Sequence, residues 1–252
     1  DRPADFESVL ECVDLAFRYE ESEPLVLDGV HLRIEKGTTV GLVGETGSGK
    51  STLLDLLMGL LRPTTGSVML DSSPLEGNAV GAWRRAIAHV PQDIYLADAS
   101  IAQNIAVGVP ERQIDMNQVR ESARLAHVDE FVEEEALQYE TRVGERGIRL
   151  SGGQKQRIGI ARALYKGVSV LILDEATSAL DSVTERSVME GIASSGEGIT
   201  VIMVAHRLTT LLDCDRIFEM RDGKIIAEGR FEDLMKHSVS FRELARSLPE
   251  AH

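Results

Sequence analysis

The sequence has few cysteines, and none of them are close together. Cys12 and Cys214 are the only two in 252 residues, and neither belongs to a CxxC pattern or lies near a pair of histidines. Disulfide frameworks and cysteine-ligated metal clusters need several cysteines at short spacings. The sequence therefore predicts neither, and both thiols are expected to be reduced packing groups in a cytosolic setting.

Basic residues are scarce relative to acidic ones. The chain has 27 Lys and Arg against 41 Asp and Glu, which gives a formal net charge of −14. A general nucleic-acid or anionic-membrane surface needs clustered Lys and Arg to neutralise phosphates. The composition therefore argues against a nucleic-acid partner, and any anion that binds must do so at a local site.

A long hydrophobic run is also missing. The longest apolar stretch, Leu53 to Leu61, contains Asp55 and is well short of the roughly 20 residues that a bilayer-crossing helix needs. The start at Asp1 shows no basic segment followed by an apolar one, so no secretory signal is predicted. We expect a domain cut from a longer chain, soluble when isolated.

The pattern of apolar residues predicts an α/β fold. Alternating stretches at 9–13, 15–19 and 30–34 are typical of antiparallel strands, whereas the uniformly apolar runs 168–173 and 199–204 suit buried parallel strands. Between about 93 and 147, residue types and spacing favour helices. Arg221 to Lys224 is expected to join two short strands as a hairpin, with helices from 231 to 247.

The segment from Gly44 to Ser51 fits the pattern GxxxxGK[ST], after an apolar strand and before a helical stretch expected over 50–61. Such a loop cradles phosphates with its amides, while Lys50 adds positive charge at the β and γ positions and Ser51 can hold Mg²⁺. The alternative is an accidental glycine-rich turn. The residues expected to bind phosphate are Gly44, Glu45, Thr46, Gly47, Ser48, Gly49, Lys50, Ser51 and Thr52.

Two carboxylates follow the apolar run at 168–173. Asp174 and Glu175 are expected at the carboxyl edge of the sheet, where α/β proteins bind ligands. Asp174 suits a Mg²⁺ role, and Glu175 could act as the general base toward water. Alternatively, both acids cap the segment that follows.

The stretch Leu150 to Gln154 reads Leu-Ser-Gly-Gly-Gln and opens a helical run. Ser151 and Gln154 form a capping box, which explains those two residues structurally. Gly152 and Gly153 lower helix stability unless something must approach the backbone closely. The pattern therefore predicts a second anion site here.

This stretch resembles the signature of ABC-family ATPases, and together with the phosphate loop it is similar to that family in the expected order along nearly the whole chain. The resemblance implies a P-loop NTPase core of mostly parallel sheet at 1–92 and 163–252, with an N-terminal antiparallel β subdomain. It also implies an inserted α-helical subdomain at 93–162 that carries the signature.

The resemblance extends to four further residues. It implies that Tyr19 stacks on adenine, that Gln92 touches Mg²⁺ or the attacking water, that Asp181 belongs to the D-loop, and that His206 contacts the γ-phosphate. Alternative explanations stay open for three of them: an ordinary strand aromatic for Tyr19, an exposed loop amide for Gln92, and a structural or exposed His206.

Several segments resemble exporter-type members of the family, above all Thr141 to Gly147 before the signature and Asn104 to Ala106. The segment Pro91 to Asp98 is similar to exporters of lipids or lipid-linked sugars. The resemblance implies an ATPase that uses ATP and Mg²⁺ at the cytoplasmic face of a membrane. Its partners would be a transmembrane domain and a second copy or homologous domain, paired head to tail with two composite ATP sites.

Two other functions compete with this hypothesis. A soluble ABC-type ATPase in nucleic-acid or ribosome work predicts basic patches, a tandem cassette or a coiled-coil insertion, and the sequence has none of these. A nucleotide-gated module without turnover is disfavoured by Glu175 and His206. The transported substrate does not follow from the sequence.

Overall fold

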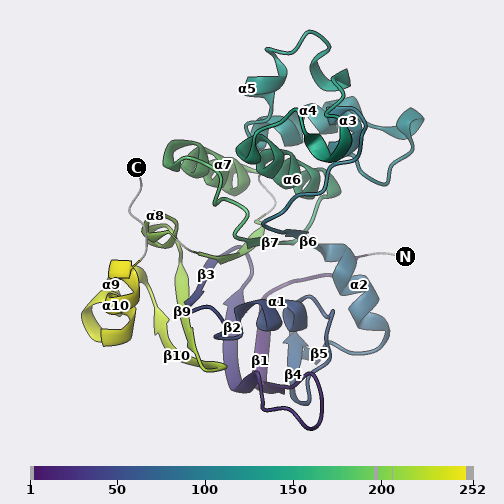
Figure 1. Cartoon of the computed structure of the whole chain (residues 1–252). Coiled ribbons are helices and arrows are strands. Elements are labelled where there is room, and N and C mark those ends of the chain that lie inside the picture. The colour runs from purple at the N-terminus through teal and green to yellow at the C-terminus, as the bar shows by residue number, and fades with distance from the viewer. Residues whose placement is uncertain (1–2, 196–197, 206, 248–252) are drawn as a thin grey trace. The chain divides into compact units, whose positions relative to one another are not determined.

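The structure is a computed structural model that describes residues 3–195, 198–205 and 207–247. By their internal contacts these residues fall into two compact units (Figure 1). The first unit comprises the described residues of 3–87 and 200–247, and the second comprises those of 88–199. The predicted extent of the helical subdomain, 93–162, stays a prediction.

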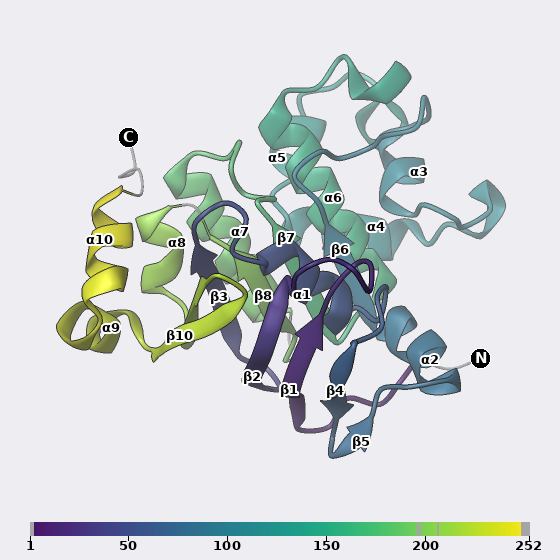
Figure 2. The same cartoon turned by 60° about the horizontal axis from the view of Figure 1, so that its bottom comes forward.

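The first unit contains the predicted antiparallel sheet, with strand order β2-β1-β4-β5 (Figure 2). Its strands are β1 (Val9–Phe17), β2 (Leu27–Glu35), β4 (Thr65–Leu70) and β5 (Ser73–Pro74). The prediction of two strands at 9–13 and 15–19 was wrong, because β1 is continuous. The register shifts between Cys12 and Leu15, and Asp14 has φ 47°, so a bulge there breaks the alternation without ending the strand.

The second sheet contributes four strands to the first unit, in the order β10-β9-β3-β8. They are β3 (Thr39–Gly44), β8 (Thr200–Val204), β9 (Arg216–Arg221) and β10 (Lys224–Gly229). β3 pairs in parallel with both β8 and β9, and all five residues of β8 are buried, as the apolar run predicted. β9 and β10 form the predicted antiparallel hairpin.

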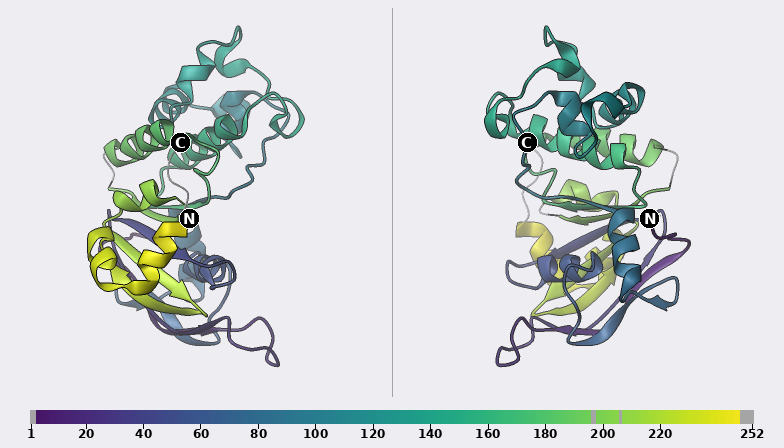
Figure 3. Two further views of the ribbon diagram at one scale, coloured as in Figure 1. Left: turned by 60° about the vertical axis from the view of Figure 1, so that its left-hand side comes forward. Right: turned by 90° about the vertical axis from the view of Figure 1, so that its right-hand side faces the viewer.

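The helices of the first unit are α1 (Lys50–Leu57), α2 (Asn78–Ala86), α8 (Leu208–Leu212), α9 (Phe231–His237) and α10 (Val239–Ser247). Figure 3 shows α9 and α10 in yellow beside the hairpin strands. The helix predicted to reach Leu61 ends at Leu57, whose carbonyl accepts a 2.7 Å hydrogen bond from the buried Trp83 indole. Gly59 follows with φ 68°, a left-handed conformation that cannot continue the helix.

The second unit holds two adjacent strands and a set of helices. The strands are β6 (Ile87–Val90), which begins at the last residue of the first unit, and β7 (Val170–Asp174). The helices are α3 (Ile101–Ile105), α4 (Met116–Leu125), α5 (Asp129–Val132), α6 (Gly152–Lys166) and α7 (Ser182–Ser194). Short 3-10 turns occur at Glu111–Gln113, Gln138–Glu140 and Glu145–Gly147.

Within the region from about 93 to 147 that was predicted to be helical, the segment 128–137 is helical only in part. The helix there is limited to α5, Asp129–Val132, and the following Glu133, Glu134 and Glu135 are exposed. Gln138 follows with φ 45°, a left-handed conformation that does not continue a right-handed helix. Within the described part of the chain, no helix has the length and apolar content required to cross a bilayer.

Both cysteines are buried and unpaired with each other, as expected. Burial raises the pKa of the Cys12 thiol to about 12, and burial together with the charges of Asp215 and Asp213 does the same for Cys214. Thiols with such a high pKa remain protonated at neutral pH and are poor nucleophiles. Both behave as small apolar core residues.

Candidate functional site

The phosphate-loop motif connects β3 to α1. β3 ends at Gly44 and α1 begins at Lys50, so the motif spans the predicted strand, loop and helix. Gly44, Gly47 and Gly49 have φ values of 151°, 85° and 100°, which favour glycine. A methyl group on Gly44 would collide with the Met220 carbonyl oxygen, whereas none of the described atoms lies within 4 Å of one on Gly47.

Lys50 lies inside this loop. It is 7% exposed, and its Nζ donates to the carbonyl oxygens of Gly44 and Glu45 at 2.8 and 2.9 Å. A longer contact of 3.4 Å reaches the Ser48 hydroxyl. The ammonium is thus held at the start of α1, whose N-cap residue is a glycine without a side-chain cap. A helix N-terminus that carries a fixed ammonium group is suited to binding a chain of phosphates.

The β9–β10 turn supports the loop. The Gly223 amide donates to the Ser48 carbonyl at 3.2 Å, and the Gly223 carbonyl accepts from the Asp28 amide at 3.0 Å. A Cβ on Gly223 would collide with the Val26 carbonyl oxygen. Sequence reasoning identified this turn only as a hairpin and missed its support of the loop; the Asp222-Gly223 pair was the available signal.

Tyr19 lies just beyond the end of β1. Its hydroxyl is 3.1 Å from Oγ1 of Thr52, which is buried, and its ring meets Phe17 edge to face at 4.9 Å between centroids. Tyr19 nevertheless remains 58% exposed. The ring is anchored at its hydroxyl and offers exposed surface, which suits stacking on a flat heterocycle. The first unit therefore brings Tyr19, Thr52 and the phosphate loop together.

In the second unit, the two predicted carboxylates stand at the end of β7. Asp174 is its last residue, and Glu175 follows with φ 54°, a left-handed conformation that costs on the order of 1–3 kcal/mol for a non-glycine residue. Two successive turns come next, closed by the Ser178 amide on the Glu175 carbonyl and by the Leu180 amide on the Thr177 carbonyl, each at 3.0 Å. Residues 174 and 175 are both half-buried.

Asp181 caps α7. Its carboxylate accepts from the amides of Val183 and Thr184 at 3.1 and 3.0 Å and from the Thr184 hydroxyl at 2.7 Å. The hydrogen bond from the Thr184 hydroxyl has the largest effect on the pKa of this carboxyl and lowers it, and the hydrogen bond from the Thr184 amide lowers it further. The N-cap of α7 is therefore Asp181 rather than Asp174 or Glu175.

The N-terminus of α6 carries the predicted capping box. The Gln154 amide donates to the Ser151 hydroxyl at 3.2 Å, and the Ser151 amide donates to the Gln154 side-chain oxygen at 2.8 Å. Gly152 and Gly153 face Ala179: an added Cβ would lie 3.3 Å from its Cβ and 3.1 Å from its carbonyl oxygen, respectively. The close approach that the glycines permit is thus made by this chain's own loop, while Ser151 and Gly152 remain exposed.

The structure gives little information on two of the predicted residues, Gln92 and His206. Gln92 is an exposed residue shortly after β6. His206 lies outside the described residues. Among the residues that the structure does describe, no group of three or more His, Cys, Asp or Glu could hold a metal ion.

Sequence reasoning missed Gln156 on α6. Its side chain is buried, 3% exposed, and its Oε1 accepts from the Ala179 amide at 3.0 Å. Its Nε2 donates to the Ser178 hydroxyl at 3.3 Å and makes a long 3.5 Å contact with the Glu175 carbonyl. Lying between Lys155 and Arg157 in the sequence, it gave no sign of burial.

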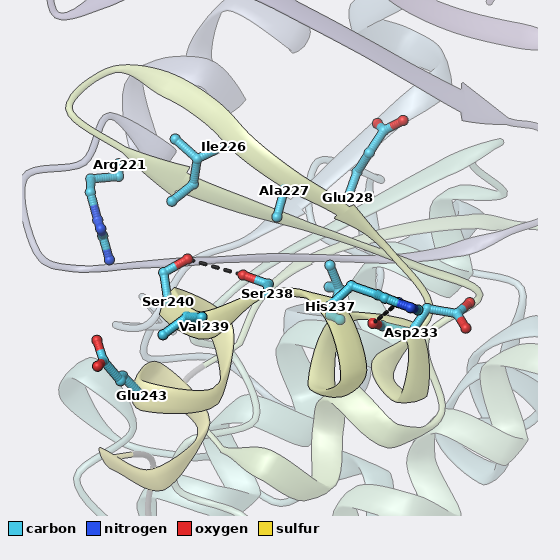
Figure 4. Close-up of a pocket in the computed structure, with 11 residues that line it drawn as sticks. Arg221, Ile226, Ala227, Glu228, Asp233, His237, Ser238, Val239, Ser240 and Glu243 are labelled. Carbon is cyan, nitrogen blue, oxygen red and sulfur yellow. Dashed lines mark hydrogen bonds between the residues drawn. The ribbon is translucent and has the colours of Figure 1, made fainter.

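A separate hollow of about 590 Å³ lies between β10 and the helices α9 and α10 (Figure 4). Two hydrogen bonds lie at its wall: the hydroxyls of Ser238 and Ser240 are 3.0 Å apart, and Nδ1 of His237 is 3.0 Å from the backbone carbonyl of Asp233. None of its lining residues belongs to the predicted phosphate loop. This hollow is distinct from the candidate nucleotide site.

The strand, phosphate loop and helix, together with the signature helix, define a P-loop ATPase of the ABC class. Comparison with known proteins agrees with that class: the family model described as "ABC transporter" matches residues 27–178. The chain belongs to the ABC transporter family and carries its ATP-binding, ATPase domain.

The chain is 44% identical to an ATP-dependent lipid A-core flippase of Alkalilimnicola ehrlichii, over 92% of this chain and 39% of that protein. It is 42% identical to the heterocyst differentiation ATP-binding protein HepA of Nostoc, over 90% and 37%, respectively. Among solved structures, a bacterial Atm1-family ABC exporter with ATP bound matches with a TM-score of 0.90 and 32% identity, over 99% of this chain and 44% of that one. The chain thus spans less than half the length of these relatives.

Proposed function

We propose that the chain binds ATP with Mg²⁺ and hydrolyses it as the motor domain of an exporter-type membrane transporter. The observation that carries this proposal is the phosphate loop, in which Lys50 Nζ is bound by the carbonyls of Gly44 and Glu45. These neutral acceptors hold the ammonium where a phosphate chain would meet it. In the proposed complex Lys50 turns to the β and γ phosphates, and the amides of 44–52 surround them.

Three side chains have proposed roles in hydrolysis. Ser51 and Asp174 hold Mg²⁺, which neutralises charge on the phosphates when it is bound. Glu175 accepts the proton of the attacking water as general base. Its half-buried position and its constrained backbone favour a carboxylate with a fixed location. Tyr19 stacks on adenine, Gln92 orients the water or the metal, and His206 contacts the γ-phosphate.

The remaining predicted residues are proposed to act on the ATP of a partner. Ser151, Gly152, Gly153 and Gln154 lie at the N-terminus of the 15-residue helix α6, and the first two are exposed. An exposed helix N-terminus attracts anions, and a phosphate already held by one chain's loop leaves this surface for another copy. Asp181 lies at the start of α7 and completes the pairing surface in this proposal.

The relatives' names support an attachment to a membrane domain. The curated relatives include proteins named as lipid A-core flippases, and the similar structure is titled as an exporter. We therefore propose a transmembrane-domain partner at the cytoplasmic face, with the core at 1–92 and 163–252 and the helical subdomain at 93–162. A soluble ABC-type ATPase is the alternative, and the exporter-like segment 141–147 disfavours it.

The test is a phosphate-release assay on the purified chain with ATP, with and without Mg²⁺. We expect release that depends on both protein and Mg²⁺ and stops when EDTA is added. ATP binding without any release over a range of protein concentrations would instead support a nucleotide-gated module. The gene sequence upstream of the codon for residue 1 separates the membrane transporter from the soluble ATPase. Hydrophobic spans encoded there, in the same chain, would support the transporter.

A further inference from the structure

The loop after Glu175 is tied to the signature helix by one buried side chain. Gln156 lies one turn into α6 and reaches the loop with both ends of its amide: Oε1 accepts from the Ala179 amide at 3.0 Å, and Nε2 donates to the Ser178 hydroxyl at 3.3 Å. The Glu175 carbonyl is 3.5 Å from the same nitrogen. One glutamine thus contacts three residues of the five from 175 to 179.

The loop 175–179 contains a backbone conformation that neighbouring contacts must stabilise. Glu175 has φ 54°, and an L-residue keeps a left-handed backbone only where its surroundings hold it there. The turn that follows is closed by the Ser178 amide on the Glu175 carbonyl at 3.0 Å, so fixing Ser178 also fixes the backbone of Glu175. A second tie, from the Thr177 hydroxyl to the buried Glu185 at 2.6 Å, holds the loop from α7.

Gln156, on the α6 side of the contact, is also held in place by its surroundings. Gln156 is 3% exposed, and its helix begins at the capping box of Ser151 and Gln154. Ala179 also packs against the backbone of Gly152 and Gly153, at 3.3 and 3.1 Å from the positions of an added Cβ. The start of α6 and the loop 175–179 therefore form one packed block within the second unit.

We propose that Gln156 is a positioning residue for hydrolysis: it holds the backbone of the loop 175–179 so that the Glu175 carboxylate stays in one place. This inference rests on the proposed role of Glu175 as general base. Gln156 itself touches neither nucleotide nor water in this account. Loss of its amide would leave ATP binding intact and lower turnover, because a misplaced base loses rate without changing the phosphate loop.

The test uses Gln156→Met, which keeps the length and volume of the side chain but removes both hydrogen-bonding groups. We expect kcat for ATP hydrolysis to fall by about tenfold or more, with KM and the ATP dissociation constant changed by less than about twofold. Gln156→Ala serves as a second variant with the same expected direction. Gln118→Met is a control for the same substitution away from the loop: the exposed Gln118 donates from its amide to the backbone carbonyl of Tyr165 in α6 at 2.8 Å.

A second background separates positioning from general damage to the fold. With Glu175→Gln already present, adding Gln156→Met should change the residual rate by less than about twofold, since the base to be positioned is gone. An equal loss of rate in both backgrounds, or a Gln156→Met enzyme with wild-type kcat, would overturn the proposal while leaving the ATPase function intact. A wild-type chain that does not hydrolyse ATP would overturn both.

Discussion

The two glycines Gly44 and Gly47 lie in the same loop but should respond very differently to substitution by alanine. Gly44 has φ 151° and pairs with Met220 across two strands of the sheet, and an added Cβ would collide with the Met220 carbonyl oxygen. Neither backbone can retreat without breaking that pairing. Gly47 has φ 85°, but its Cβ would meet none of the described atoms within 4 Å.

The magnitudes follow from these two environments. Gly47→Ala carries only the backbone penalty of a left-handed residue, about 1–2 kcal/mol in the free energy of unfolding. Gly44→Ala adds a backbone collision inside the sheet, and overpacking of this kind costs a further 1–3 kcal/mol or more. We therefore expect Gly44→Ala to lose about 2–5 kcal/mol, a large fraction of the roughly 5–15 kcal/mol that stabilises an ordinary domain.

Urea denaturation of both variants without nucleotide, followed by circular dichroism, measures the difference. Equal losses for the two substitutions, or a smaller loss for Gly44→Ala, would contradict the packing described between Gly44 and Met220. The slope of the transition should remain unchanged for Gly47→Ala, which would show that the comparison concerns the folded state.

Two further predictions concern the chemistry. Lys50→Ala should abolish ATP hydrolysis and weaken nucleotide binding, because the loop loses the charge that offsets the β and γ phosphates; unchanged turnover in the phosphate-release assay would exclude this loop as the site. Glu175→Gln should keep ATP affinity while slowing hydrolysis by roughly a hundredfold or more, as expected for loss of a positioned base. In size-exclusion chromatography with ATP and Mg²⁺ that variant should persist as a dimer, and near-normal turnover by a monomer would refute the role of Glu175.

The sequence predicted those parts of the fold that local chemistry determines. The apolar runs around β7 and β8 and the glycine-rich segment between β3 and α1 carry their own signals, because buried strands and phosphate loops restrict residue type directly. The capping box at Ser151 is likewise local and was found where it was expected. The residues of the phosphate loop, the two carboxylates and the signature came from such patterns, whereas Tyr19, Gln92, Asp181 and His206 came from the family resemblance. The roles of all of them in catalysis stay predictions.

The features that could not be predicted from the sequence depend on contacts between segments that are distant along the chain. The end of α1 at Leu57 is set by Trp83, the support of the loop at Ser48 comes from Gly223, and the burial of Gln156 comes from the loop at Ala179. The residue types on one side of such a pair can mark a turn, as Asp222-Gly223 does, but they do not identify the distant residue that it contacts. A glutamine between two charged residues is typical of an exposed helix face, and only the tertiary structure shows otherwise.

The most direct test of the central claim mixes two inactive variants, Lys50→Ala and Ser151→Arg. Each alone should lack turnover, because in a head-to-tail pair both sites of either variant contain one damaged half. Ser100→Ala is a control for loss of a helix cap, since Ser100 closes the same kind of capping box on α3 and lies outside the proposed site. That control should remain active.

In a mixed pair one site contains both damaged halves and the other contains none. The account therefore predicts that mixing restores ATP hydrolysis, or restores ATP-dependent association when Glu175→Gln is added to the Ser151→Arg chain to hold the intact site unhydrolysed. A mixture that neither hydrolyses ATP nor associates, while both variants remain folded by circular dichroism, would contradict it. In that case Ser151 to Gln154 would serve only as the cap of α6.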